Sequence, residues 1–128
     1  MKTDPVRPGE LQLRILEILW ERREASVSEV HAVLAPERGL APTTVATMLR
    51  KMELRGLVEH REEGRAFIYR AAVRSEDVAR GAGEHFVERL FEGSLAGAVQ
   101  HLLQTREVSR DELDQLAKLV RDAKRRAR

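Results

Sequence analysis

Hydrophobic positions in the N-terminal part of the chain repeat with the period of α-helices. Between residues 10 and 23, two adjoining apolar rows predict a helix that is buried around most of its circumference. Ser26 and Glu29 form a capping-box pattern, which predicts the start of a second helix of about ten residues. Pro42 suits the first position of a third helix, and Gly56 suits the left-handed position that follows its end.

An alternating pattern of apolar and polar residues follows the third helix. Residues 57–61 and 65–70 are predicted to form the two strands of a hairpin, with its turn at residues 62–64. Helix, short helix, helix and hairpin within about 70 residues is the order of a winged helix-turn-helix domain. We therefore predict a mainly α fold with a small β-hairpin, in which residues 1–72 form this domain.

The remaining part of the chain, residues 73–128, is helical in its periodicity and is predicted to form a second, C-terminal domain. It carries more large apolar side chains than three short helices can bury among themselves, and leaving half of them exposed would cost on the order of 10 kcal/mol. We expect these side chains to form the interface of a symmetric homodimer. The alternative is that the tail docks onto the N-terminal domain of its own chain. The side chains are Phe86, Leu90, Phe91, Leu95, Val99, Leu102, Leu103, Leu113, Leu116 and Val120.

The distribution of charge matters more than its sum for any interaction with nucleic acid. Residues 1–71 carry 12 basic and 11 acidic side chains, and residues 72–128 carry 11 and 10. Neither half has the excess of positive charge that would by itself indicate a polyanion-binding domain, so the positions of the charges have to decide.

The exposed face of the third helix has the character of a DNA recognition helix. Thr43, Thr47 and Arg50 lie opposite the apolar row, with Ala46 and Lys51 on the flanks. Small polar groups near the N-terminus of such a helix can meet base edges, and arginine can bind guanine or phosphate. The alternative interpretation is an amphipathic helix whose polar face is only solvated.

The predicted hairpin carries basic side chains where a wing meets the DNA backbone. Arg61 and Arg65 flank the acidic pair Glu62 and Glu63, so we expect the wing to position the protein rather than to read sequence. The alternative is an ordinary surface hairpin with exposed Arg–Glu pairs, which stabilise little.

Several classes of chemistry are not expected from this composition. The chain has no cysteine, which removes disulfides, thiolate metal sites and cysteine nucleophiles. Its four histidines lack a metal-binding spacing, and there is no nucleophile elbow or phosphate-binding glycine loop. We therefore expect no enzyme activity, no metal and no cofactor. Without a long apolar run or a secretion signal at the N-terminus, the expected location is the cytoplasm, with no membrane insertion.

The order of these motifs resembles the penicillinase repressor (BlaI/MecI-like) family of winged-helix regulators over residues 8–124. The segments that carry the resemblance are GEL at 9–11, APTTVATML at 41–49, GLV at 56–58, GRAFIY at 64–69, FEGSL at 91–95 and the Ser109, Glu112, Leu113, Leu116 pattern. The resemblance implies a homodimeric repressor whose N-terminal domain binds an operator dyad in double-stranded DNA. In such a dimer, two recognition helices lie about one helical turn of DNA, or a multiple of it, apart.

The resemblance also implies specific roles for residues of this chain. Thr44 and Thr47 match recognition-helix positions that meet DNA, while Thr43 falls where relatives often carry a basic residue. Relatives are commonly released from DNA by proteolysis, signalled by a membrane-bound metalloprotease that senses β-lactams. The corresponding bond lies near His101 and Leu102, where relatives that are cut have Asn-Phe.

Two departures from the family pattern and one alternative function remain. Ala41 stands where relatives often have a serine N-cap, which removes about 1 kcal/mol unless Thr43 or Thr44 compensates. The lack of cysteine excludes the thiolate copper sensing of one branch of the family. The alternative function is a helical protein–protein adaptor that uses residues 86–103 to bind a protein and does not bind DNA.

Overall fold

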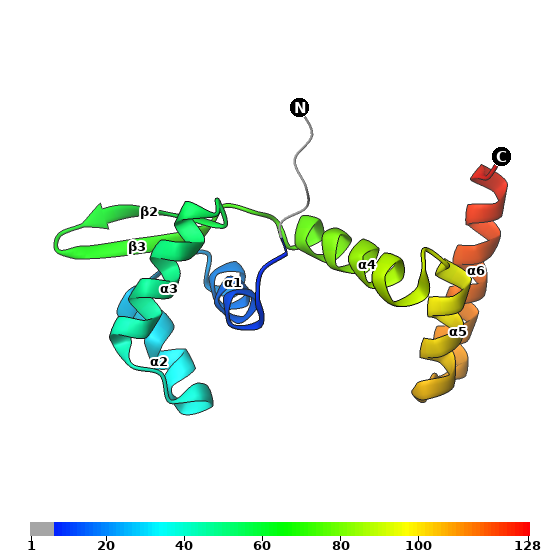
Figure 1. The fold of residues 1–128 in the computed structure, drawn as a ribbon, viewed down its shortest axis with the longest axis horizontal. Helices are drawn as coiled ribbons and strands as arrows, with labels where there is room; N and C mark the ends of the chain where they lie inside the picture. The colour runs from blue at the N-terminus through cyan, green and yellow to red at the C-terminus, as the bar shows by residue number, and fades with distance from the viewer. Residues whose placement is uncertain (1–6) are drawn as a thin grey trace. The chain divides into compact units, whose positions relative to one another are not determined.

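The computed structural model describes residues 7–128, and the chain forms two compact units, one ending at Gly83 and the other spanning Glu84–Arg128. The N-terminal residues on which the expectation of no secretion signal depends lie mostly outside the described part. The elements, shown in Figure 1, are α1 (Glu10–Arg22), β1 (Ala25–Ser26), α2 (Val27–Arg38), α3 (Pro42–Leu54), β2 (Val58–Glu63), β3 (Ala66–Ala71), α4 (Ser75–Phe91), α5 (Leu95–Thr105) and α6 (Arg110–Arg126).

The N-terminal unit has the predicted winged-helix arrangement of three helices and a β-hairpin. Its sheet has three antiparallel strands in the order β1-β3-β2, and the hairpin β2-β3 projects beyond the helices in Figure 1. The sequence pattern missed β1, in which Ala25 pairs with Tyr69 and Ser26 with Ile68. Two residues are too few to show an alternating pattern, so only pairing with β3 reveals this strand.

The turn of the wing begins two residues later and ends one residue later than predicted. Glu63 pairs with Ala66, which makes Gly64 and Arg65 the two-residue loop. Gly64 supplies a positive φ of 62° that a tight hairpin loop requires and that other residues rarely adopt. The expected turn at residues 62–64 was therefore wrong, and Arg65 occupies the tip of the wing instead of its flank.

The core of the N-terminal unit joins the apolar rows of α1, α2 and α3 to the sheet. The fully buried side chains of these three helices confirm the predicted helix faces, and they are Ile15, Leu16, Ile18, Leu19, Val30, Leu34, Val45, Leu49 and Met52. The Trp20 indole donates a hydrogen bond of 2.9 Å to the Val73 carbonyl, and Val78 of α4 is also part of this core. Through these contacts the first turns of α4 belong to the N-terminal unit, which ends at Gly83. The sequence placed the domain boundary after residue 72.

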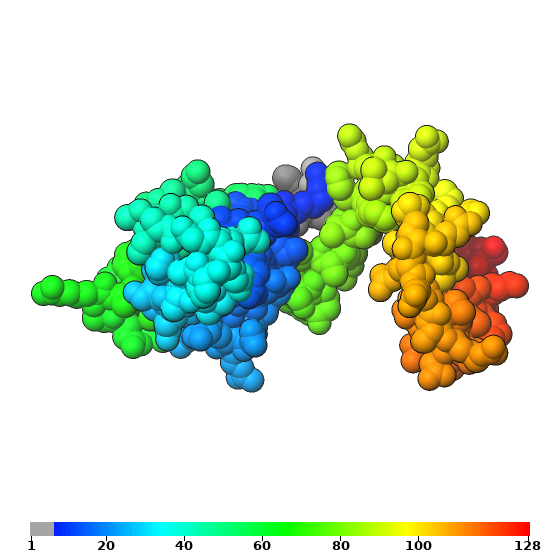
Figure 2. Space-filling view, turned by 90° about the horizontal axis from the view of Figure 1, so that it is seen from below, coloured from blue at the N-terminus to red at the C-terminus, as the bar shows by residue number. Residues whose placement is uncertain are grey.

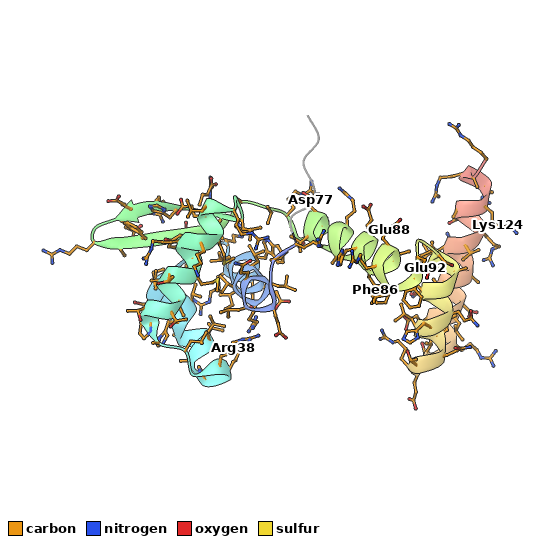
Figure 3. All side chains as sticks on the ribbon, viewed as in Figure 1. Arg38, Asp77, Phe86, Glu88, Glu92 and Lys124 are labelled. Atoms are coloured by element: carbon orange, nitrogen blue, oxygen red, sulfur yellow. The ribbon has the colours of Figure 1, made fainter. Side chains whose placement is uncertain are left out.

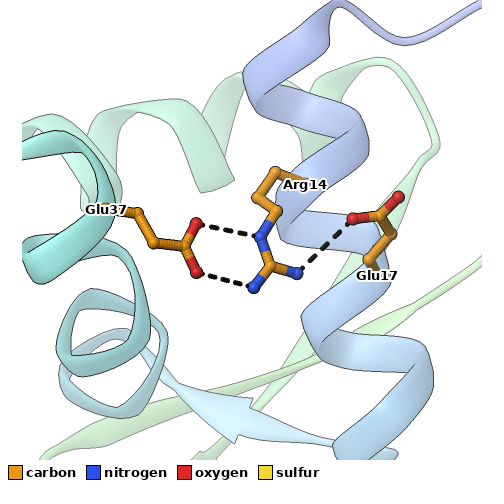
Figure 4. Close-up of polar contacts among 3 residues, drawn as sticks. All are labelled: Arg14, Glu17 and Glu37. Carbon is orange, nitrogen blue, oxygen red and sulfur yellow. Dashed lines mark hydrogen bonds and ion pairs between the residues drawn. The ribbon is translucent and has the colours of Figure 1, made fainter.

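A charged pair also joins α1 to α2 (Figure 4). The Arg14 guanidinium donates two hydrogen bonds to Glu37, of 3.0 Å and 2.7 Å, and lies 3.4 Å from Glu17. The hydrogen bonds with Glu37 raise the pKa of Arg14, and the same bonds lower the pKa of the Glu37 carboxyl. Because both side chains are partly exposed, solvent screens the pair, and it contributes little to stability.

The helix ends follow the predicted signals, including the missing cap at the start of α3. Ser26 accepts a 3.1 Å hydrogen bond from the Glu29 amide, and the Glu29 carboxylate accepts one of 2.8 Å from the Ser26 amide. This capping box lowers the pKa of Glu29. At α3, however, Ala41 offers no side-chain cap, and the Thr44 and Val45 amides reach only its carbonyl oxygen.

The uncapped end of α3 gives a stability prediction. Ala41 already has the extended backbone of an N-cap residue, with φ −74° and ψ 152°. We expect Ala41→Ser to raise the free energy of unfolding by about 1 kcal/mol, because the new hydroxyl would accept a hydrogen bond from a backbone amide of the first turn. Urea unfolding followed by circular dichroism measures this change. Ala41→Val is the matched control, and a serine variant no more stable than the valine variant would contradict the prediction.

The C-terminal unit is built from the end of α4 and from α5 and α6, and α5 and α6 lie side by side in Figures 1 and 2. Serine hydroxyls cap both later helices: Ser94 accepts from the Gly97 amide at 2.9 Å, and Ser109 accepts from the Glu112 amide at 3.1 Å. Figure 3 shows that most side chains of α6 extend into solvent, and this helix has no fully buried residue.

Candidate nucleic-acid interface

The exposed face of α3 carries the residues that the sequence assigned to it. Its buried face, formed by Val45, Leu49 and Met52, fixes this orientation because these side chains have no exposed surface. Arg50 donates a 3.3 Å hydrogen bond to the Thr47 hydroxyl, so the two side chains lie next to each other on the surface. The assigned residues are Thr43, Thr44, Thr47, Arg50 and Lys51, all exposed, and Ala46, half-buried.

A groove lies between α3 and the wing, and the start of α2 also lines it. Arg50 of α3 and Arg65 at the tip of the wing both line it, together with Phe67 and Ser28. No carboxylate is among the described residues that line this groove. Two guanidinium groups on opposite sides of a groove without acidic residues can bind the phosphates of a nucleic-acid strand.

Arg61 does not share this environment, although the sequence pattern treated it like Arg65. Its guanidinium binds Glu24 at 2.9 Å and Glu63 at 2.6 Å. Both hydrogen bonds raise the pKa of Arg61, and the one to Glu24 has the larger effect. Side chains alternate between the faces of a strand, and Arg61 lines a hollow with Glu24 and Ile68 rather than the groove beside α3. The sequence could not show this, because Glu24 is 37 residues away.

Sequence reasoning also missed the start of α2 as part of the groove. The capping box marked the N-terminus of this helix, but only the tertiary structure places Ser26 and Ser28 beside Arg50. The capping box already satisfies the Ser26 and Glu29 amides and holds the Glu29 carboxylate at this helix end.

A histidine joins α3 to the base of the wing. His60 Nδ1 lies 2.8 Å and 3.0 Å from the two carboxylate oxygens of Glu53 on α3. Its ring stacks on Phe67 with 4.3 Å between the ring centroids and 19° between the planes, and Tyr69 lies 5.3 Å away. Burial raises the pKa of Tyr69. The cluster links the end of α3 to the start of β2.

The C-terminal unit exposes the apolar side chains that the sequence assigned to dimerisation. Leu90 is 68% exposed and Val120 is 59% exposed, whereas Phe86 and Phe91 are half-buried against each other, 5.2 Å apart between centroids. Leu116 is also half-buried. The remaining members of this set, all exposed, are Leu95, Val99, Leu102, Leu103 and Leu113.

Residues 7–128 contain no group of three or more histidine or acidic side chains that could hold a metal ion. Two of the histidines have other partners, since His31 Nε2 lies 2.9 Å from the Leu40 carbonyl oxygen and His60 contacts Glu53. In the same residues, no helix has the length and hydrophobicity needed to span a membrane.

Comparison with known proteins agrees with this architecture. The BlaI transcriptional regulator of Mycobacterium tuberculosis is 32% identical over 117 residues, which cover 89% of this chain and 83% of that protein. The solution structure of the DNA-binding domain of the repressor BlaI matches with a TM-score of 0.52 and 27% identity, over 60% of this chain and 93% of that one. Bacillus licheniformis BlaI in its monomeric form, solved in complex with the blaP half-operator, matches with a TM-score of 0.50 and 26% identity, over the same shares.

The sequence profile of the penicillinase repressors covers nearly all of the chain that the structure describes. It matches residues 8–122, which include the winged-helix unit, α4, α5 and most of α6. The chain therefore belongs to the penicillinase repressor family of winged-helix transcriptional regulators.

Proposed function

We propose that this protein is a homodimeric transcriptional repressor that binds an operator dyad in double-stranded DNA. The observation that carries the proposal is the groove between α3 and the wing, where Arg50 and Arg65 flank a lining without carboxylates next to the exposed threonines of α3. A relative with the same fold is solved on a half-operator, which supports DNA as the partner. Operator binding would place the protein in the cytoplasm.

The two sides of this surface would have different tasks. Thr43, Thr44 and Thr47 lie on the exposed face of α3, where short side chains let the helix approach base edges in the major groove. Arg50 and Arg65 border the groove, where the DNA backbone would pass between α3 and the wing.

Exposure of large apolar side chains in the C-terminal unit supports the homodimer. Leu113, Leu116 and Val120 recur along one face of α6 at the spacing of a helix–helix seam, and none of them is fully buried within the unit. A second copy of the same face would cover them and would give each dimer two recognition helices.

Release of the repressor by proteolysis is the further part of the proposal, with a membrane-bound metalloprotease sensor as the partner. The bond between His101 and Leu102 lies inside α5, and both side chains are exposed. A protease would have to unwind this helix locally before it could cut. Mass spectrometry of the protein from cells treated with a β-lactam tests this, since a cut here yields a fragment that ends at residue 101.

DNA footprinting on the region upstream of the protein's own gene tests the main proposal. We expect two protected half-sites related by a dyad, and Thr47→Ala should lower the preference for this site over a scrambled duplex by about 1–3 kcal/mol. Thr105→Ala is the matched control, because Thr105 ends α5 and bonds only the His101 carbonyl. A protein that protects no sequence, or a Thr47 variant with unchanged preference, would contradict the proposal.

A further inference from the structure

One large apolar side chain lies at the end of α3, outside the core that the helix helps to form. Leu54 is the last residue of α3, and 89% of its surface is exposed. Among the described residues of the N-terminal unit, Leu54 and Phe67 are the large apolar side chains that the fold leaves exposed. Phe67 lines the groove beside α3, so one of the two already borders the proposed DNA-binding surface.

The helical spacing places Leu54 in line with residues assigned to DNA contacts. It follows Thr47 by seven positions and Arg50 by four, and residues at these spacings share one face of an α-helix. The same geometry puts Leu54 opposite Val45, nine positions earlier, whose side chain is fully buried. Thr47, Arg50 and Leu54 therefore form one exposed row that runs to the C-terminal end of α3.

This row is long enough for its two ends to meet different base pairs. Seven residues of α-helix rise about 10 Å, which corresponds to about three base-pair steps of B-form DNA. A helix that lies along the major groove would place Thr47 over one base pair and Leu54 over another.

The charged neighbours of Leu54 favour the approach of DNA to this end of the helix. Glu53 would repel phosphates, but its carboxylate is bound to His60 at 2.8 Å, at the base of the wing. Lys51, three positions before Leu54, is exposed and can bind the DNA backbone beside the row. The last turn of α3 therefore presents an apolar side chain next to a basic one.

The chemistry of leucine restricts what Leu54 can recognise on DNA. Its side chain has no hydrogen-bond donor or acceptor, so it binds neither phosphate nor the polar edge of a base. The apolar group that the major groove presents is the C5 methyl group of thymine. Contact between this methyl group and Leu54 would remove apolar surface of both from water.

We propose that Leu54 is a specificity-determining residue that recognises a thymine methyl group in each half-site, at a base pair beyond the one that Thr47 meets. This inference rests on the proposed DNA-binding function and adds the direct reading of one base to it. Leu54 would discriminate thymine from the other bases without a hydrogen bond, through the burial of apolar surface alone.

Substitution of single thymines by deoxyuridine in one half-site tests this role, because deoxyuridine lacks only the methyl group. Fluorescence anisotropy of the full-length protein measures its affinity for each labelled duplex from its own upstream region. At one position the substitution should weaken wild-type binding about fourfold, as expected for one buried methyl group, and should change Leu54→Ala binding by less than about 1.5-fold. On the unsubstituted duplex, Leu54→Ala should bind about fourfold to tenfold more weakly, with an unchanged salt dependence because no phosphate contact is lost.

Two further variants serve as controls. Leu54→Met keeps an apolar side chain of similar volume and should keep the sensitivity to the methyl group. Thr47→Ala should also remain sensitive at this position, because it removes a contact to another base pair. Leu54 is exposed, so these changes leave the core intact, and circular dichroism checks that each variant is folded.

The outcomes separate this inference from the proposed function. Wild-type protein that binds no duplex overturns the function, and the role of Leu54 with it. Wild-type protein that binds, while Leu54→Ala responds to every deoxyuridine substitution as the wild type does, overturns this inference alone. A Leu54→Ala variant with wild-type affinity for the unsubstituted duplex also overturns it.

Discussion

Replacing Val120 with aspartate is expected to leave the protein folded but monomeric, and to lower its affinity for a two-half-site operator by about 100-fold. Val120 is 59% exposed in the single chain, so the charge does not have to enter a core for the monomer to fold. In the proposed dimer the same carboxylate would be buried against an apolar face of the partner, which is strongly unfavourable. A monomer can contact only one half-site at a time, so the gain in affinity from binding both half-sites together is lost.

Sedimentation equilibrium and DNA titrations measure the two parts of this prediction. Affinity for a duplex with one half-site should change by less than about threefold, because α3 and the wing are untouched. Gln115→Asp is the matched control, since it adds the same charge to an exposed position on another face of α6. If Val120→Asp remains a dimer, the proposed seam on α6 is wrong.

Removing both arginines of the groove is the second large perturbation. Arg50→Ala with Arg65→Ala should lower DNA affinity by roughly 30-fold to 100-fold, and should flatten the dependence of log K on log salt by about 1.8, which corresponds to two phosphates. The effect should be similar for specific and scrambled duplexes, because phosphate contacts carry no sequence information. Titrations at four salt concentrations measure both quantities.

Arg61→Ala is the control for this double variant, and it separates the structure from the sequence pattern. Arg61 is already paired with Glu24 and Glu63 and lies away from the groove, so its loss should change affinity by less than about threefold. An Arg61 variant that weakens binding as much as an Arg65 variant would mean that the wing presents its other face to DNA.

Local signals in the sequence determined the helices and their faces. The apolar rows of α1 and α3 predicted which side chains are buried. The capping box at Ser26 and Glu29 and the glycine at position 56 placed helix ends, because a cap depends on residues three or four positions apart. The excess of large apolar side chains after residue 85 was also visible, since it depends only on composition and periodicity.

Contacts between distant residues were decided by the tertiary structure. Pairing of β1 with β3 and the two-residue loop at Gly64 and Arg65 set the register of the wing, and that register separates Arg61 from Arg65. Arg61 pairs with Glu24, and the start of α2 lines the groove together with Arg50 and Arg65. Both contacts join segments more than 20 residues apart. The sequence by itself therefore determined the winged-helix fold and the exposed face of α3, because both follow from short-range periodicity. Which arginines are free for DNA depended on strand register and long-range ion pairs, which no local pattern encodes.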